Sequence, residues 1–64
     1  MNNQMYQSDV EQYNLLITAK NCLYYSEFNG FIDSVKYLNV INYNIIRKEC
    51  IRLGRFVEYM PAIN

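Results

Sequence analysis

Five of the six basic residues of this chain lie in the twenty residues from 36 to 55, where Glu49 is the only acid. The other acidic residues lie before or after this segment, so a net charge of zero hides a local positive region. Ammonium and guanidinium groups bind phosphate oxygens, and one basic face can hold a phosphate backbone even on a neutral protein. The basic residues of this segment are Lys36, Arg47, Lys48, Arg52 and Arg55.

Other chemistry finds little support among the side chains of this sequence. There is no histidine, which excludes a Ser-His or Cys-His nucleophile, and two glycines cannot form a phosphate-cradling loop. Cys22 and Cys50 do not form a Cys-x-x-Cys pair, so we expect reduced, buried thiols rather than metal ligands or a disulfide. We therefore expect no catalytic residues, no metal, no cofactor and no small-molecule substrate.

The size and composition of the chain are typical of one small folded domain, residues 1–64. Residues 1–7 are polar, and we expect them to be flexible. A 52% share of hydrophobic residues argues against a disordered chain, although sixty-four residues are near the lower limit for folding alone. The start of the chain lacks the features of a signal peptide, and no apolar run is long enough to span a bilayer, so we expect a cytoplasmic protein.

The hydrophobic pattern predicts a mainly α fold, a small three-helix domain that positions the basic segment. Ser8 to Glu11 has the form of a capping box, and the apolar stripe that follows predicts a first helix over about 9–25. Residues 56–60 alternate weakly and end at Pro61. This pattern predicts a short C-terminal strand or an extended tail.

Asn29-Gly30 leaves two interpretations open for residues 22–38. Both residues tolerate positive φ, so the pair predicts the turn of a β-hairpin, which would make the fold α+β. The alternative is a short helix, with Phe31 and Val35 on its buried face. We favour the helix because the spacing of three and four residues fits this segment better than strict alternation.

A third helix is predicted over residues 42–54. Asn39 is suited to end the preceding short helix in a left-handed conformation, and Asn42 or Asn44 can cap the next one. Gly54 is a stop signal that follows basic residues in the last turn. The predicted core-facing residues of this helix are Ile45, Ile46, Cys50 and Leu53.

Two apolar half-patterns flank a polar turn in residues 31–59. They are Val35-x-x-Leu38-Asn39-Val40 and Ile46-Arg47-x-x-Cys50-x-x-Leu53-Gly54. Together they resemble helix-turn-helix DNA-binding domains, especially winged-helix and excisionase-like ones, although those families usually have alanine where Val35 stands. The resemblance implies that the start of the recognition helix reads base edges in the major groove of double-stranded DNA while basic side chains hold phosphates. The implied DNA-binding residues are Lys36, Asn42, Tyr43, Asn44, Arg47, Lys48, Arg52 and Arg55.

The resemblance implies a small DNA-binding protein, either a transcriptional regulator or an excisionase-like factor of a phage or mobile element, which reads the major groove with helix 42–54. One small module makes few contacts with DNA, so we expect a homodimer that associates through Tyr13, Tyr24 and Tyr25. The alternative is a small phage-type inhibitor or adaptor that binds and blocks a host protein, because a dipolar charge layout and exposed tyrosines also suit a protein interface. A third interpretation leaves the basic segment as solvated helix surface.

Overall fold

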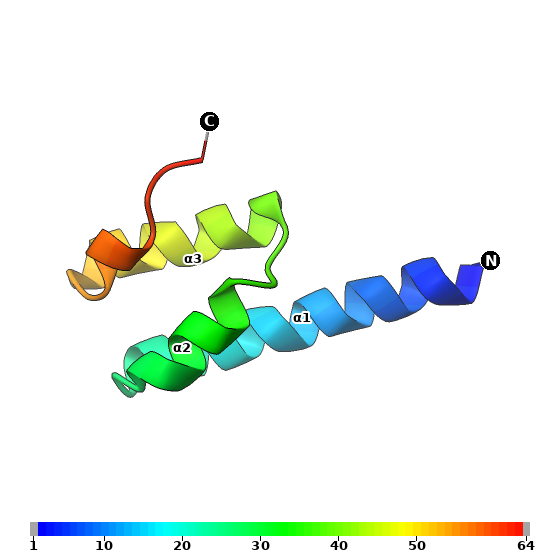
Figure 1. The fold of residues 1–64 in the computed structure, drawn as a ribbon, viewed down its shortest axis with the longest axis horizontal. Helices are drawn as coiled ribbons and strands as arrows, with labels where there is room; N and C mark the ends of the chain where they lie inside the picture. The colour runs from blue at the N-terminus through cyan, green and yellow to red at the C-terminus, as the bar shows by residue number, and fades with distance from the viewer. Residues whose placement is uncertain (1, 64) are drawn as a thin grey trace.

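Residues 2–63 form three helices and one short 3-10 turn. The computed structural model describes residues 2–63, and it describes side chains from Asp9 onward. The elements are α1 (Asn2–Tyr24), α2 (Phe28–Val35), α3 (Val40–Leu53) and η1 (Val57–Tyr59). The prediction of a mainly α, three-helix domain is confirmed. Figure 1 shows α2 packed on the C-terminal half of α1, while the N-terminal half of α1 extends beyond the other elements.

The first helix begins at Asn2, earlier than the predicted start near residue 9, and ends at Tyr24. Residues 8 to 11 lie inside this helix, so the predicted capping box does not begin it. Farther along, Ala19 and Leu23 are completely buried one turn apart, which fixes the side of α1 that faces the core. The expected flexibility of residues 1–7 stays a prediction, because Met1 and the side chains of residues 2–8 lie outside the described part of the chain.

The Asn29-Gly30 pair lies inside α2, so the prediction of a short helix is confirmed and the hairpin alternative is wrong. Glu27 caps this helix, because its carboxylate accepts a hydrogen bond of 2.7 Å from the Gly30 amide. Gly30 also permits a close approach to α1. A Cβ atom at this position would lie 2.8 Å from the sulfur of Cys22, closer than real side chains tolerate.

Asn39 is the cap of α3, not a left-handed end to α2. Its backbone is extended, with φ −72° and ψ 172°, and its side chain accepts a hydrogen bond of 2.9 Å from the Asn42 amide. The helix therefore begins at Val40, two residues before the predicted start, and neither Asn42 nor Asn44 caps it. Gly54 ends α3 in the left-handed conformation with φ +64°, as the sequence predicts.

The C-terminal segment forms the 3-10 turn η1 rather than a strand, and no strand occurs among residues 2–63. Phe56, just before this turn, has φ +62°, and its ring centroid lies 4.9 Å from that of Phe31 and 5.4 Å from that of Phe28. This aromatic cluster turns the chain back over the helices, and Met60 is fully buried as a result. The core consists of Ala19, Leu23, Phe31, Val35, Ile46, Cys50 and Met60.

Candidate interaction surface

Two arginines of the basic segment donate hydrogen bonds to carbonyl groups of this same chain. Nε of Arg47 donates to the carbonyl oxygen of Met60 at 2.8 Å, and Arg47 is half-buried. Nη1 of Arg55 donates to the carbonyls of Leu23 and Tyr24 at 2.9 and 3.0 Å. These are the last carbonyls of α1, where a cation also compensates the negative end of the helix dipole. Both guanidinium groups therefore stabilise the fold.

Arg52 is paired with the one acid of the basic segment. It donates two hydrogen bonds to the Glu49 carboxylate, and the hydroxyl of Tyr24 donates a third at 2.8 Å. The bonds from Arg52 and Tyr24 lower the pKa of Glu49 to about 2. The same bond from Tyr24 to the carboxylate raises the pKa of the Tyr24 hydroxyl. This group of three side chains joins α1 to α3.

The two lysines of the segment are exposed. Nζ of Lys36 lies 3.5 Å from the Asp33 carboxylate, and both side chains are more than half exposed, so the pair is weak. Lys48 is exposed and makes no hydrogen bond or ion pair with the described residues. The five cations thus do not form one free basic face. Three of them are engaged in firm internal contacts.

Among the residues expected to read DNA bases, two contact other parts of this chain. Nδ2 of Asn42 lies 3.3 Å from Oε1 of Gln12 on α1, and the hydroxyl of Tyr43 donates to the carbonyl of Pro61 at 2.7 Å. Asn44 is half-exposed on the outer side of α3. The structure therefore leaves Asn44 and Lys48 on the outside and directs Asn42 and Tyr43 toward neighbouring segments.

Gln12 is a structural residue that the sequence analysis missed. Its Nε2 donates to the carbonyl of Tyr37 at 2.9 Å, and its Oε1 accepts from the amide of Asn39 at 2.9 Å. These bonds tie α1 to the connection between α2 and α3 and so position the start of α3. A polar residue on a helix surface adds nothing to the apolar periodicity of the sequence. The main partners of Gln12 are backbone groups, which every residue carries, so the sequence does not indicate its role.

The tyrosines of the expected self-association surface are all exposed but do not share one face. Tyr13 and Tyr24 lie on one side of α1, eleven residues or about three turns apart, with exposed fractions of 63% and 44%. Tyr25 follows the end of the helix and lies outside this stripe. Val10 and Ile17 continue the stripe, with exposed fractions of 42% and 39%. The predicted apolar stripe of this helix is therefore partly exposed.

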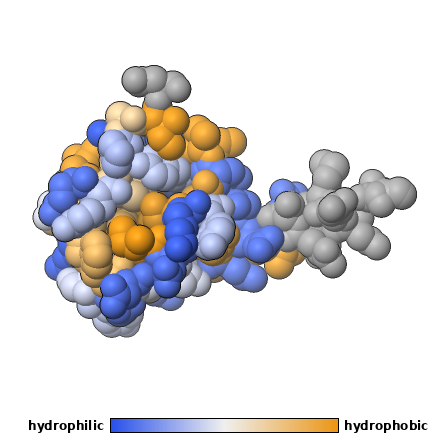
Figure 2. Space-filling view, viewed as in Figure 1, coloured by the Kyte–Doolittle hydropathy of each residue, from blue (hydrophilic) through white to orange (hydrophobic). Residues whose placement is uncertain are grey.

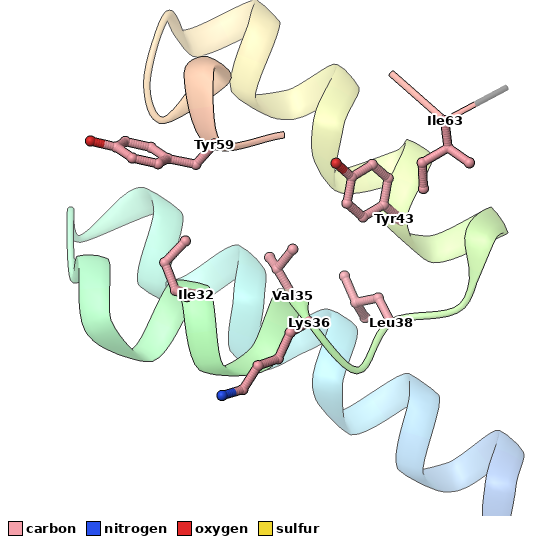
Figure 3. Close-up of a pocket in the computed structure, with 7 residues that line it drawn as sticks. All are labelled: Ile32, Val35, Lys36, Leu38, Tyr43, Tyr59 and Ile63. Carbon is pink, nitrogen blue, oxygen red and sulfur yellow. The ribbon is translucent and has the colours of Figure 1, made fainter. Parts of the chain in front are cut away.

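An open apolar groove of about 370 Å³ lies between α2, α3 and the C-terminal residues. Figure 2 shows apolar residues in the hollow between α2 and α3. In Figure 3, residues of α2 and of the connection after it face residues of α3, η1 and the C-terminal segment across the groove, while the ammonium group of Lys36 points away from its centre. The lining residues are Ile32, Val35, Lys36, Leu38, Tyr43, Tyr59 and Ile63.

The two thiols show no sign of catalytic activation. Cys22 and Cys50 are both free, and burial raises the pKa of each thiol. In the described part of the chain, no three His, Cys, Asp or Glu residues are placed to hold a metal ion. Among the described helices, none combines the length and apolar character needed to cross a membrane.

Comparisons with known proteins leave the structure as the main guide. No family model, curated protein or solved structure matches this chain significantly. The resemblance to helix-turn-helix domains therefore rests on the residues of the sequence alone. The surfaces that the fold exposes must carry the argument about function.

Proposed function

We propose that this chain is a small protein-binding adaptor or inhibitor that holds an apolar segment of its partner in the groove between α2, α3 and the C-terminal residues. The observation that carries the proposal is the groove itself. Its size is within the range of sites that take up apolar side chains or small ligands, and six of its seven lining residues are aliphatic or aromatic.

The groove is held open by contacts that do not depend on a partner. The bond from Tyr43 to Pro61 and the bond from Arg47 to Met60 keep the C-terminal residues beside α3, so Ile63 forms one wall. The opposite wall belongs to α2 and the residues after it, which pack on the core. A preformed site loses less conformational entropy on binding than a site that must first be ordered.

The partner segment we propose is apolar, with a carboxylate beside it. Lys36 lies at the rim of the groove, and its weak, exposed pair with Asp33 can be exchanged for an acidic group of a partner. Tyr59, which is 48% exposed, offers an aromatic surface at the other end. Tyrosines and apolar anchors in a pocket, with a charged rim, are typical of protein interfaces.

The proposal is tested by affinity capture with a matched pair of variants. Ile63 and Ile51 are 46% and 51% exposed, but only Ile63 lines the groove. The immobilised wild-type protein and the Ile51→Glu variant should retain the same stoichiometric partner from a lysate of the source or host cells. The Ile63→Glu variant should lose it with unchanged helicity. Equal retention by both variants would refute the groove as the binding site.

DNA binding is the second candidate. The outer side of α3 favours it, because Asn44 and Lys48 lie one turn apart on that side and make no hydrogen bond with the described residues. The connection between α2 and α3 is also short, four residues from 36 to 39, as in helix-turn-helix domains. Only Lys36 and Lys48 of the segment are available for phosphates, so we expect weak, strongly salt-dependent binding.

A titration of labelled duplex DNA at two salt concentrations separates the candidates. If the chain reads DNA through α3, Lys48→Ala should weaken binding several-fold, while Lys20→Ala on α1 should not. Arg47→Glu is a poor test, because its loss also removes the bond to Met60. No binding at low salt by the folded protein would remove this candidate and leave the groove.

A further inference from the structure

An exposed apolar stripe runs along α1 on the side that borders α3. Val10, Tyr13 and Ile17 follow each other at intervals of three and four residues, which places them on one helix face. Their exposed fractions are 42%, 63% and 39%. None of them belongs to the core or to the groove described above. The stripe therefore has no partner within the described part of the chain.

The neighbouring side of α3 extends this apolar surface. Polar contacts join α1 and α3 at both ends of this surface, between Gln12 and Asn42 at one end and between Tyr24 and Glu49 at the other. Ile17 lies between Gln12 and Tyr24 on α1, and Ile45 lies between Asn42 and Glu49 on α3. The two isoleucines are therefore at about the same position along the pair of helices. Ile45 is 39% exposed, and Ile41, one turn earlier, is 71% exposed. The seam between the helices is thus apolar on its outer side.

The charges of α1 select the direction of a partner helix. Asp9 lies in its N-terminal half and Lys20 near its C-terminal end, eleven residues and about 16 Å apart on the same side of the helix. A parallel copy of α1 would place like charges together. An antiparallel copy places each Asp9 beside the Lys20 of the other chain. Within one residue of that register, or about 1.5 Å along the helix, each Tyr13 lies at the level of the Ile17 of the other chain.

We infer that the chain forms an antiparallel homodimer, in which α1 of each copy lies along the seam between α1 and α3 of the other. In this antiparallel arrangement, opposite charges are paired and apolar residues are also paired. A two-fold symmetric interface requires such a surface that is complementary to itself. The N-terminal half of α1 extends beyond the body (Figure 1), and an isolated helix of that length is only marginally stable in water. A second copy supplies apolar contacts to Val10, Tyr13 and Ile17.

Charge reversal tested by analytical ultracentrifugation decides this inference. The wild-type chain should sediment as a monomer–dimer equilibrium that depends on concentration. Lys20→Glu alone should raise the dissociation constant of the dimer about tenfold or more, because each pair becomes repulsive. Adding Asp9→Lys should restore the wild-type constant to within about threefold. Glu11→Lys, a charge reversal on the opposite side of the same helix, is the matched control and should change nothing.

Two outcomes would overturn the inference. One is a wild-type protein that stays monomeric up to its solubility limit. The other is a double variant that dimerises no better than Lys20→Glu. In an antiparallel contact, Lys at position 9 should attract Glu at position 20 of the other chain and so restore the dimer. Asp9→Lys alone must weaken the dimer as Lys20→Glu does. Far-UV circular dichroism of each variant verifies that it is folded.

Discussion

The first helix packs on its two neighbours in different ways. Against α2 the contact is apolar and close, with Leu23 and Phe31 fully buried and Gly30 against Cys22. Against α3 the core residues Ile46 and Cys50 are accompanied by polar contacts, through Gln12 and through the bond from Tyr24 to Glu49, and other apolar side chains remain outside. We conclude that the α1–α2 contact supplies most of the stability, while the α1–α3 contact sets an orientation and leaves apolar surface exposed.

The largest predicted effect lies in the α1–α2 contact. Phe31→Ala should destabilise the domain by about 3–5 kcal/mol, enough to unfold much of so small a protein. Phe28→Ala is the matched control, since Phe28 also contacts Phe56 but is 38% exposed, and it should cost clearly less. Urea denaturation followed by circular dichroism measures both. Equal losses would show that burial of Phe31 is not what holds α2 to α1.

The close approach at Gly30 gives the next largest effect. In Gly30→Ala the new Cβ would collide with the Cys22 sulfur and displace the Glu27 cap, at a cost of about 1–3 kcal/mol that exceeds the better helix propensity of alanine. In a Cys22→Ala background the same substitution should cost less. A double-mutant cycle in urea measures the coupling. Additive effects of the two substitutions would contradict the close contact.

A smaller loss is expected on the α3 side. Gln12→Ala removes the bonds to Tyr37 and Asn39 and should destabilise the domain by about 1 kcal/mol. Asn14→Ala, on an exposed position of the same helix, serves as the control and should stay within about 0.5 kcal/mol of wild type. A loss for Gln12→Ala as large as that for Phe31→Ala would reverse the comparison of the two contacts.

The smallest effect is a pH dependence of the link between Tyr24, Glu49 and Arg52. Because folding lowers the pKa of Glu49 from 4.5 to about 2, the stability it contributes is present above pH 4.5 and is lost as the pH falls toward 2. The difference in urea midpoint between wild type and Glu49→Gln should therefore shrink over this range. A constant difference would show that the carboxylate gains nothing from its partners in the fold.

Much of the fold could be predicted because its signals are local. Apolar residues at intervals of three and four identify the short helix with Phe31 and Val35, and a glycine after basic residues identifies the end of α3 at Gly54. The predicted strand over 56–60 is wrong because contacts of the Phe56 ring with other aromatic residues override a weak alternation. The predicted starts of the first and third helices are also wrong, because several Ser and Asn residues in the sequence are equally suitable caps.

The roles of the basic residues could not be predicted from the sequence. Arg47 binds a carbonyl thirteen residues away, and Arg55 binds carbonyls thirty-one and thirty-two residues away. Every residue carries a carbonyl, so such acceptors leave no mark in the sequence. The pairings of Arg52 with Glu49 and of Lys36 with Asp33, each three residues apart, were the internal contacts of these cations that spacing alone could have indicated.

The arginines of the basic segment stabilise this fold, and apolar surfaces remain exposed. The most direct measurement is the free energy of unfolding of Arg47→Gln beside that of Lys48→Gln. We predict a loss of about 1.5–3 kcal/mol for Arg47→Gln, from its charged hydrogen bond to Met60, and a change within about 0.5 kcal/mol for Lys48→Gln. Wild-type stability in both variants would contradict the account.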